Sequence, residues 1–140
     1  MSTNSRIGYI ENGKTKSIYC HWDGYINHNG VILGTFYKTL EEVKELVELG
    51  DLSVLGKRIG EKVDFNKMSI DPIYREKYDG QCVAYHRDRE EDLCISTMSI
   101  VELEHDQEFN YLFNNGQWYV SCNANNYTFI PLDFYLKEIT

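Results

Sequence analysis

The sequence has no excess of basic residues: 14 Lys and Arg side chains stand against 22 Asp and Glu, which gives a formal net charge of −8. Proteins that bind DNA or RNA regardless of its sequence rely on Lys and Arg to neutralise phosphates. Broad nucleic-acid binding is therefore not expected. The balance still leaves room for a local basic pocket that takes a small phosphate ligand.

Long hydrophobic runs are also missing, since no apolar stretch approaches the length of a transmembrane helix. The first residues, 1–6, are polar and contain no apolar signal-peptide core. We therefore expect no membrane association and a location in the cytoplasm where the protein is made. With 140 residues, 42% of them apolar, and no internal repeat, the chain is predicted to form a single domain over residues 1–140.

Cysteines are few and lie far apart, with no Cys-x-x-Cys pair, so in a reducing cytoplasm we expect four free, small and buried thiols: Cys20, Cys82, Cys94 and Cys122. Cys82 and His86, four residues apart, invite a test for zinc. On a strand this separation spans roughly 13 Å, too far for two ligands that each sit roughly 2 Å from one ion. We predict no metal and no other cofactor.

Common catalytic motifs are missing too: the sequence has no nucleophile elbow, no metal-binding His-x-x-x-His and no kinase-type motif. His21 and Asp23 have the chemistry of a general base and its orienting partner. A His and an Asp two residues apart on a strand, however, often occur by chance and without a catalytic role. We therefore expect a binding protein and not an enzyme.

What is present centres on residues 17–25, Ser-Ile-Tyr-Cys-His-Trp-Asp-Gly-Tyr. We predict a strand over 15–22, and successive side chains of a strand point to opposite faces. The apolar face carries Ile18, Cys20 and Trp22, and the polar face carries Tyr19, His21 and Asp23, with Tyr25 in the loop that follows. A ligand-facing strand has this pattern, and an ordinary half-exposed strand explains it about as well.

A second polar stretch lies in 81–89, which we also interpret as a strand, placed in the centre of the sheet. Tyr85, Arg87 and Arg89 would then share one face. A ring beside two guanidiniums suits a nucleotide, because the ring stacks on a base and the planar donors bind phosphate oxygens. In the alternative, both arginines form surface ion pairs with the acidic residues at 90–92.

The remaining elements give the fold class. Asn12-Gly13 and Asn115-Gly116 predict two tight hairpins, over 6–22 and 108–122, in which Trp118 faces the core. Thr39 with Glu42 fits a capping box that opens the one clear amphipathic helix, which Gly50 ends. Asp51 is expected to cap a short helical turn over 51–56. Residues 57–80 are interpreted as a long surface excursion, and such excursions are often functional.

Towards the end of the chain we expect a short helix or strand within 95–103, a strand over 127–130 and a terminal helix from Pro131 to Ile139. The combination predicts an α+β domain with a mainly antiparallel sheet, built from the two Asn-Gly hairpins and the central strand and packed with the amphipathic helix.

Residues 17–25, 84–89 and 115–120 together resemble a group of small accessory proteins encoded by bacteriophages and prophages. The similarity extends through the helix and residues 50–52, with Ile26 and Glu90 standing where the group has Pro and Gly. The resemblance implies an anti-defence setting. One class of such proteins consists of homo-oligomeric sponges that sequester ADP-ribose-type immune signals, as in Thoeris defence.

From the resemblance and the residues together we expect a nucleotide-derived signal to be bound and not cleaved, by seven residues: Tyr19, His21, Asp23, Tyr25, Tyr85, Arg87 and Arg89. Two alternatives stay open. One is an inhibitor that binds a host defence enzyme, with the acidic helix face imitating nucleic acid or docking on the enzyme. The other is a small phosphodiesterase that uses His21 or His86.

Overall fold

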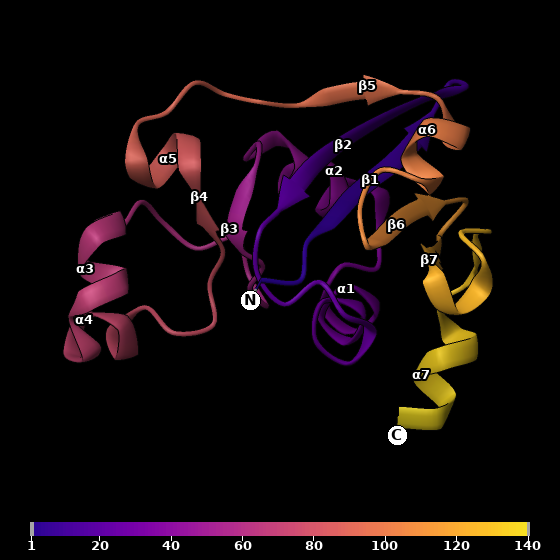
Figure 1. The fold of residues 1–140 in the computed structure, drawn as a ribbon. Helices are drawn as coiled ribbons and strands as arrows, with labels where there is room; N and C mark the ends of the chain where they lie inside the picture. Colours follow the sequence, from indigo (N-terminus) through magenta and orange to yellow (C-terminus); the bar gives the residue numbers. More distant parts are fainter. Residues whose placement is uncertain (1, 140) are drawn as a thin grey trace.

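The computed structural model describes residues 2–139, which form one eight-stranded sheet and seven α-helices (Figure 1). The strands are β1 (Ser5–Glu11), β2 (Lys14–Cys20), β3 (Leu52–Val54), β4 (Val83–Ala84), β5 (Ser96–Met98), β6 (Phe109–Asn114), β7 (Gln117–Cys122) and β8 (Ile130–Pro131). The α-helices are α1 (Val31–Phe36), α2 (Leu40–Glu48), α3 (Phe65–Ile70), α4 (Pro72–Lys77), α5 (Tyr85–Arg89), α6 (Ile100–Glu104) and α7 (Asp133–Ile139). A π-helical turn, Ile26–Gly30, leads into α1, and a 3-10 turn, Asn123–Asn125, follows β7. The α+β class is confirmed.

Both predicted hairpins are present. In the β1–β2 turn the φ angles of Asn12 and Gly13 are 54° and 76°, and in the β6–β7 turn those of Asn115 and Gly116 are 51° and 78°. Two successive positive φ angles match the right-handed twist of the flanking strands, and Asn-Gly is the dipeptide that adopts them most readily. The turn residues therefore fix the register of each hairpin.

The sheet is mixed, and the prediction of a mainly antiparallel sheet is wrong. Its strand order is β4-β3-β2-β1-β6-β7-β8, with β5 alongside β2. The first arms of the two hairpins, β1 and β6, run parallel, with Ser5 opposite Phe109. Cys20 at the end of β2 also pairs in parallel with Leu52. Turn chemistry dictates pairing within a hairpin, but it says nothing about how two hairpins meet.

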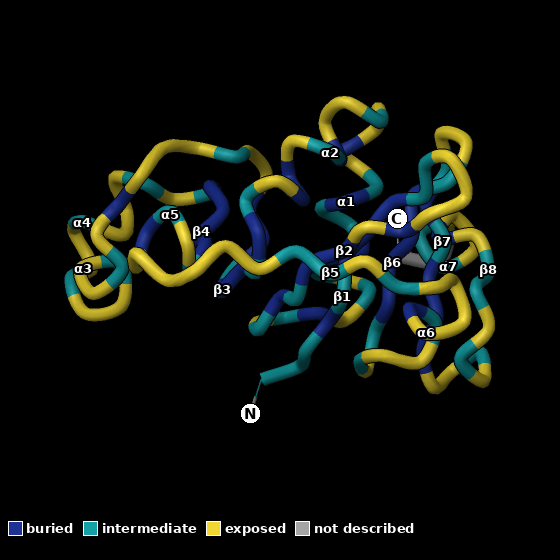
Figure 2. Tube along the Cα trace, turned by 90° about the horizontal axis from the view of Figure 1, so that it is seen from above, coloured by how far each residue is buried: buried dark blue, intermediate teal, exposed yellow. Residues whose placement is uncertain are grey.

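The core lies between the sheet and the helices α1 and α2, which Figure 2 shows on the opposite side of the sheet from α6. Helix α2 begins with the predicted capping box, in which the Thr39 hydroxyl accepts from the Glu42 amide at 3.2 Å. Trp118 is 6% exposed, and its indole N–H donates to the Tyr37 carbonyl at 2.8 Å. Its predicted place in the core is confirmed. The fully buried residues here include Ile7, Ile18, Leu33, Val43, Leu46 and Val120.

Three residues differ from their predicted roles. Trp22 is 41% exposed: it lies beyond the end of β2 at Cys20, with its amide still bonded to the Ser53 carbonyl of β3. All four thiols are free, as expected, but Cys94 is exposed while the other three are buried. Asp51 does not cap a helical turn: its carboxylate accepts from the Tyr19 amide at 2.9 Å, and the residues that follow form β3.

The predicted central strand over 81–89 is also wrong. Only the two residues of β4 are extended, at the edge of the sheet, and α5 follows directly. The cause is Asp88, whose buried carboxylate accepts from the Ala84 amide at 2.8 Å and so closes a helical turn. Glu90 ends this helix with a φ of 58°, in the left-handed region.

Residues 57–80 contain two helices, α3 and α4, each capped by an aspartate, Asp64 and Asp71. Neither helix contains a buried residue, and Figure 1 shows the pair set apart from the sheet. Within 95–103 the chain forms both β5 and the start of α6. Among the described residues there is no helix of the length and apolarity needed to span a membrane.

Candidate functional site

The predicted site residues of the first stretch divide into two groups. Tyr19 and His21 are joined by a 2.9 Å hydrogen bond between the phenol oxygen and Nδ1, and the edge of the Trp22 ring system contacts His21 with the centroids 4.7 Å apart. Asp23 lies in the turn beyond, with a φ of 58°. Tyr25 contacts His28 of the π-helical turn, at 5.9 Å between ring centroids.

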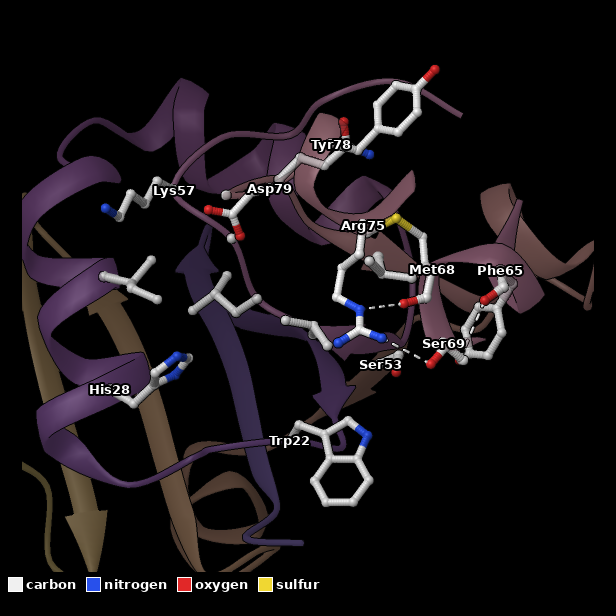
Figure 3. Close-up of a pocket in the computed structure, with 17 residues that line it drawn as sticks. Trp22, His28, Ser53, Lys57, Phe65, Met68, Ser69, Arg75, Tyr78 and Asp79 are labelled. Carbon is white, nitrogen blue, oxygen red and sulfur yellow. Dashed lines mark hydrogen bonds between the residues drawn. The ribbon is translucent and has the colours of Figure 1, made fainter. Parts of the chain in front are cut away.

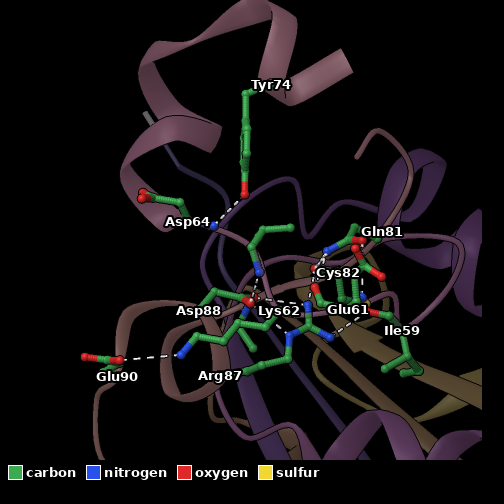
Figure 4. Close-up of polar contacts among 12 residues, drawn as sticks. Ile59, Glu61, Lys62, Asp64, Tyr74, Gln81, Cys82, Arg87, Asp88 and Glu90 are labelled. Atoms are coloured by element: carbon green, nitrogen blue, oxygen red, sulfur yellow. Dashed lines mark hydrogen bonds and ion pairs between the residues drawn. The ribbon is translucent and has the colours of Figure 1, made fainter. Parts of the chain in front are cut away.

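In the second stretch, Arg87 serves the fold. Its Nη1 donates to the Ile59 carbonyl at 2.9 Å, its Nη2 donates to the Cys82 carbonyl at 2.7 Å, and its Nε pairs with Asp88 at 2.9 Å (Figure 4). Because 85–89 is helical, Arg87 does not share a strand face with Tyr85 and Arg89. The guanidinium is engaged by the protein's own acceptors.

Tyr85 and Arg89 meet instead at Phe65 of α3. The rings of Phe65 and Tyr85 lie 5.6 Å apart, and the Arg89 guanidinium lies 5.1 Å from the Phe65 centroid. Arg89 also pairs with Glu91 at 3.3 Å. Aromatic stacking and a cation over the ring fix the orientation of Phe65 from this side.

The two predicted stretches meet at Asp51: the Tyr19 amide donates to its carboxylate at 2.9 Å, and the Tyr85 amide donates to its carbonyl at 3.2 Å. Burial, and after it the neighbouring Tyr85 phenol, raise the pKa of Tyr19. Burial also raises the pKa of Tyr85, against a hydrogen bond from Ser53 that lowers it. Ser53 belongs to β3, and its carbonyl accepts from the Trp22 amide at 3.1 Å. The sequence could not show this convergence, because it depends on β3, which lies between β2 and β4 in the sheet but far from both in the sequence.

Beside this junction lies a cleft of about 400 Å³ (Figure 3). The π-helical turn and α1 form one wall, α3 and α4 form the opposite wall, and β3 lies between them. Its lining includes Trp22, His28, Ser53, Lys57, Phe65, Met68, Arg75, Tyr78 and Asp79. None of the seven predicted binding residues lines this cleft; Trp22 is the one residue of the 17–25 stretch that does. The volume falls in the range of about 300–1,000 Å³ that is typical of small-molecule sites.

Most of this lining was missed from the sequence. Phe65, Arg75 and Asp79 lie in the stretch predicted only as a surface excursion, and Trp22 was assigned to the core. The Asp71-Pro72 pair held the available signal, since Asp at the N-cap followed by Pro at the first helical position is typical of a helix start. This signal would have indicated that residues 57–80 contain helical structure that can line a cleft, and not only a loop.

One further pattern in the sequence has no phosphate-binding geometry. Gly8, Gly13, Lys14 and Thr15 fit the letters of a phosphate-binding loop, G-x-x-x-x-G-K-T. That motif requires a loop between a strand and a helix. Here Gly8 lies within β1, Asn12-Gly13 is the hairpin turn, and Thr15 is buried in β2. The match to the motif therefore comes from the sequence of the β1–β2 hairpin and does not indicate a phosphate-binding loop.

The arrangement in the cleft suits binding. It offers aromatic faces, hydroxyl groups, a guanidinium and a carboxylate. Within residues 2–139 no three or more His, Cys, Asp and Glu side chains are grouped so that they could hold a metal ion. Compared with protein-family models, curated proteins and solved structures, the chain shows no match to any of the three, so its site is interpreted from its own geometry.

Proposed function

We propose that the chain binds a nucleotide-derived signal of the ADP-ribose class in the cleft and retains it without cleavage, as a phage anti-defence protein. The observation that carries the proposal is that one cavity combines two aromatic residues, Trp22 and Phe65, with the guanidinium of Arg75 and the hydroxyl of Ser53. Aromatic faces bind nucleobases by stacking, worth about 1–3 kcal/mol per base. Guanidiniums bind phosphate oxygens with two parallel hydrogen bonds.

Two features support retention over catalysis. The polar groups at the junction are bound to one another, as in the Tyr19–His21 hydrogen bond, and Cys82, a potential nucleophile, is buried. Burial raises the pKa of the Cys82 thiol, which keeps it in the unreactive protonated form. The phage setting rests on the resemblance of residues 17–25, 84–89 and 115–120.

The proposal is tested by incubating the protein with ADP-ribose or cyclic ADP-ribose, removing free ligand, heating, and analysing the supernatant by mass spectrometry. We expect release of the unchanged nucleotide at one equivalent per chain. Release of cleavage products would favour the phosphodiesterase, and release of nothing would contradict the proposal.

Trp22→Ala locates the site. It should weaken nucleotide binding about 5- to 150-fold, the loss of one stacking interaction. Phe134→Ala is the matched control, because Phe134 is an exposed aromatic residue on α7 that does not line the cleft. Equal losses in the two variants would place the ligand elsewhere.

A protein partner is the second candidate, favoured by one observation. Ile70 and Ile73, at the junction of α3 and α4, are 78% and 82% exposed. Exposed aliphatic residues that lie close together are typical of binding surfaces. Light scattering of the parent and of the Ile70→Ser/Ile73→Ser double variant tests whether this surface forms the proposed homo-oligomer. Capture of a host enzyme by the parent and not by the double variant would favour the inhibitor.

A further inference from the structure

Arg75 is held in a fixed orientation by the helix beside its own. Its Nε donates to the Met68 carbonyl at 2.9 Å and its Nη2 donates to the Ser69 carbonyl at 3.0 Å (Figure 3). These carbonyls belong to the last turn of α3, where helices leave acceptors without partners. Arg75 itself lies on α4. One edge of the guanidinium thus joins the two helices.

The positive charge of Arg75 is not neutralised by these contacts, because both acceptors are uncharged carbonyls. Three of the other four arginines pair with carboxylates: Arg6 with Asp106, Arg87 with Asp88 and Arg89 with Glu91. Across residues 2–139, Arg75 has no ion pair and its Nη1 has no hydrogen-bond partner. A fixed cation with donors to spare therefore lines the cleft.

We propose that Arg75 binds the anionic part of the cleft's ligand, a phosphate or pyrophosphate, and is the residue that selects nucleotides over nucleosides. The inference rests on the proposed function and deepens it, by naming the residue that binds the phosphates. It also moves the phosphate-binding role from Arg87, whose donors are used inside the fold, to a guanidinium that is already oriented.

The charge of the whole chain makes a dedicated cation necessary. At a net charge of −8 the protein repels anions at long range, so an anionic ligand requires a local positive charge. The cleft supplies one at Arg75. Lys57 lines the cleft too, with its Nζ over the Phe36 ring at 5.8 Å, and it offsets the charge of Asp79 in the same lining. The planar fork of Arg75 matches phosphate geometry in a way that the lysine ammonium does not.

Anion binding should also stabilise the α3–α4 pair, here residues 64–79. Neither helix buries a residue, and the pair is held by polar contacts such as the Asp64 amide to the Tyr74 hydroxyl at 2.9 Å. Segments with so little burial open at low free energy. A ligand phosphate on Arg75 would bind the guanidinium that joins the helices and slow amide exchange there.

The experiment compares adenosine, ADP-ribose and inorganic pyrophosphate by titration calorimetry on the parent, Arg75→Gln and Arg75→Lys. Arg75→Gln should weaken ADP-ribose binding about 10- to 100-fold and abolish pyrophosphate binding, while leaving adenosine binding unchanged. Arg75→Lys should recover part of the loss, since it keeps the charge without the fork. Arg58→Gln is the control, because Arg58 is exposed, lies outside the cleft lining and loses the same charge.

The outcomes separate the two proposals. If the parent binds adenosine and ADP-ribose equally well, or if Arg75→Gln binds ADP-ribose as the parent does, the role of Arg75 is wrong and the nucleotide site stands. If Arg75→Gln weakens adenosine and ADP-ribose binding alike, Arg75 only stabilises the α3–α4 pair. If the parent binds neither compound, the proposed function itself is wrong. Slower amide exchange of residues 64–79 with ADP-ribose, but not with adenosine, completes the expected result.

Discussion

Arg87 and Asp88, neighbours in the sequence, form an ion pair of 2.9 Å in which the arginine side chain is 16% exposed and the aspartate side chain is fully buried. The carboxylate also accepts from the Val63 and Ala84 amides at 3.0 and 2.8 Å. Four donors thus converge on two oxygen atoms (Figure 4). The pair ties α5 to the segment that leads into α3.

Asp88→Ala is therefore expected to destabilise the protein by about 3–5 kcal/mol, the cost of leaving one member of a buried ion pair uncompensated. Asp88→Asn should be nearly as harmful, because its amide N–H₂ would face N–H donors. Glu90→Gln is the control: Glu90 pairs with Lys62 at the surface, at 3.4 Å, where ion pairs contribute about 0–1 kcal/mol. Urea denaturation measures all three, and equal midpoints for Asp88→Ala and Glu90→Gln would contradict the structure.

The two tryptophans should separate stability from binding. Trp118→Ala removes a buried ring and its hydrogen bond to Tyr37, and should lower the free energy of unfolding by about 3–5 kcal/mol. Trp22→Ala removes an exposed ring and should change it by less than about 1 kcal/mol. Thermal denaturation followed by circular dichroism makes the comparison. An unchanged midpoint for Trp118→Ala would mean that the ring is not part of the core.

Local chemistry explains which elements were predictable. Asn12-Gly13 and Asn115-Gly116 dictate their turns through their φ angles, and Thr39 with Glu42 dictates the start of α2. These signals lie within a few residues of the structure they produce. The same is true of the alternation that places Ile18 in the core.

The errors have long-range causes. The parallel pairing of β1 with β6 joins residues about a hundred positions apart, and no local pattern encodes it. The 81–89 stretch alternates like a strand, but the carboxylate of Asp88 folds it into a helix by binding the amides of Ala84 and Val63. The cleft was missed for the same reason, since its walls come from four separate parts of the chain.

Alkaline pH should destabilise the fold through buried thiols, Cys20 and Cys82, whose pKa values burial raises. Burial raises the pKa of Cys20 to about 12, against about 8.5 for an unfolded cysteine. The folded chain therefore holds this proton more tightly than the unfolded chain does. Its stabilising contribution is complete below pH ~8.5 and is lost progressively as the pH rises towards 12, by about 1.4 kcal/mol per unit.

Burial also raises the pKa of Tyr37 and Tyr111, which adds to the effect at the upper end of this range. Urea denaturation at pH 7.5, 9, 10 and 10.5 should show a steadily falling free energy of unfolding. The slope should be smaller in Cys20→Ala by about one proton. A slope that is identical in parent and variant would show that Cys20 does not retain its proton in the folded chain.

Cys94 should be the one thiol that reacts in the native protein, and Asp51 should slow it. Cys94 is exposed while Cys20, Cys82 and Cys122 are buried, so a chromogenic disulfide at pH 8 should modify one thiol per chain before denaturant and four after it. The Asp51 carboxylate, followed by partial burial, raises the pKa of Cys94. Less thiolate is then present at pH 8, and the reaction is slower than for an unperturbed cysteine. Asp51→Asn should speed the reaction and shift its pH profile to lower pH, while keeping an oxygen for the Tyr19 amide. Cys94→Ser is the control and should remove the reaction. Equal rates in the parent and in Asp51→Asn would contradict the role of Asp51.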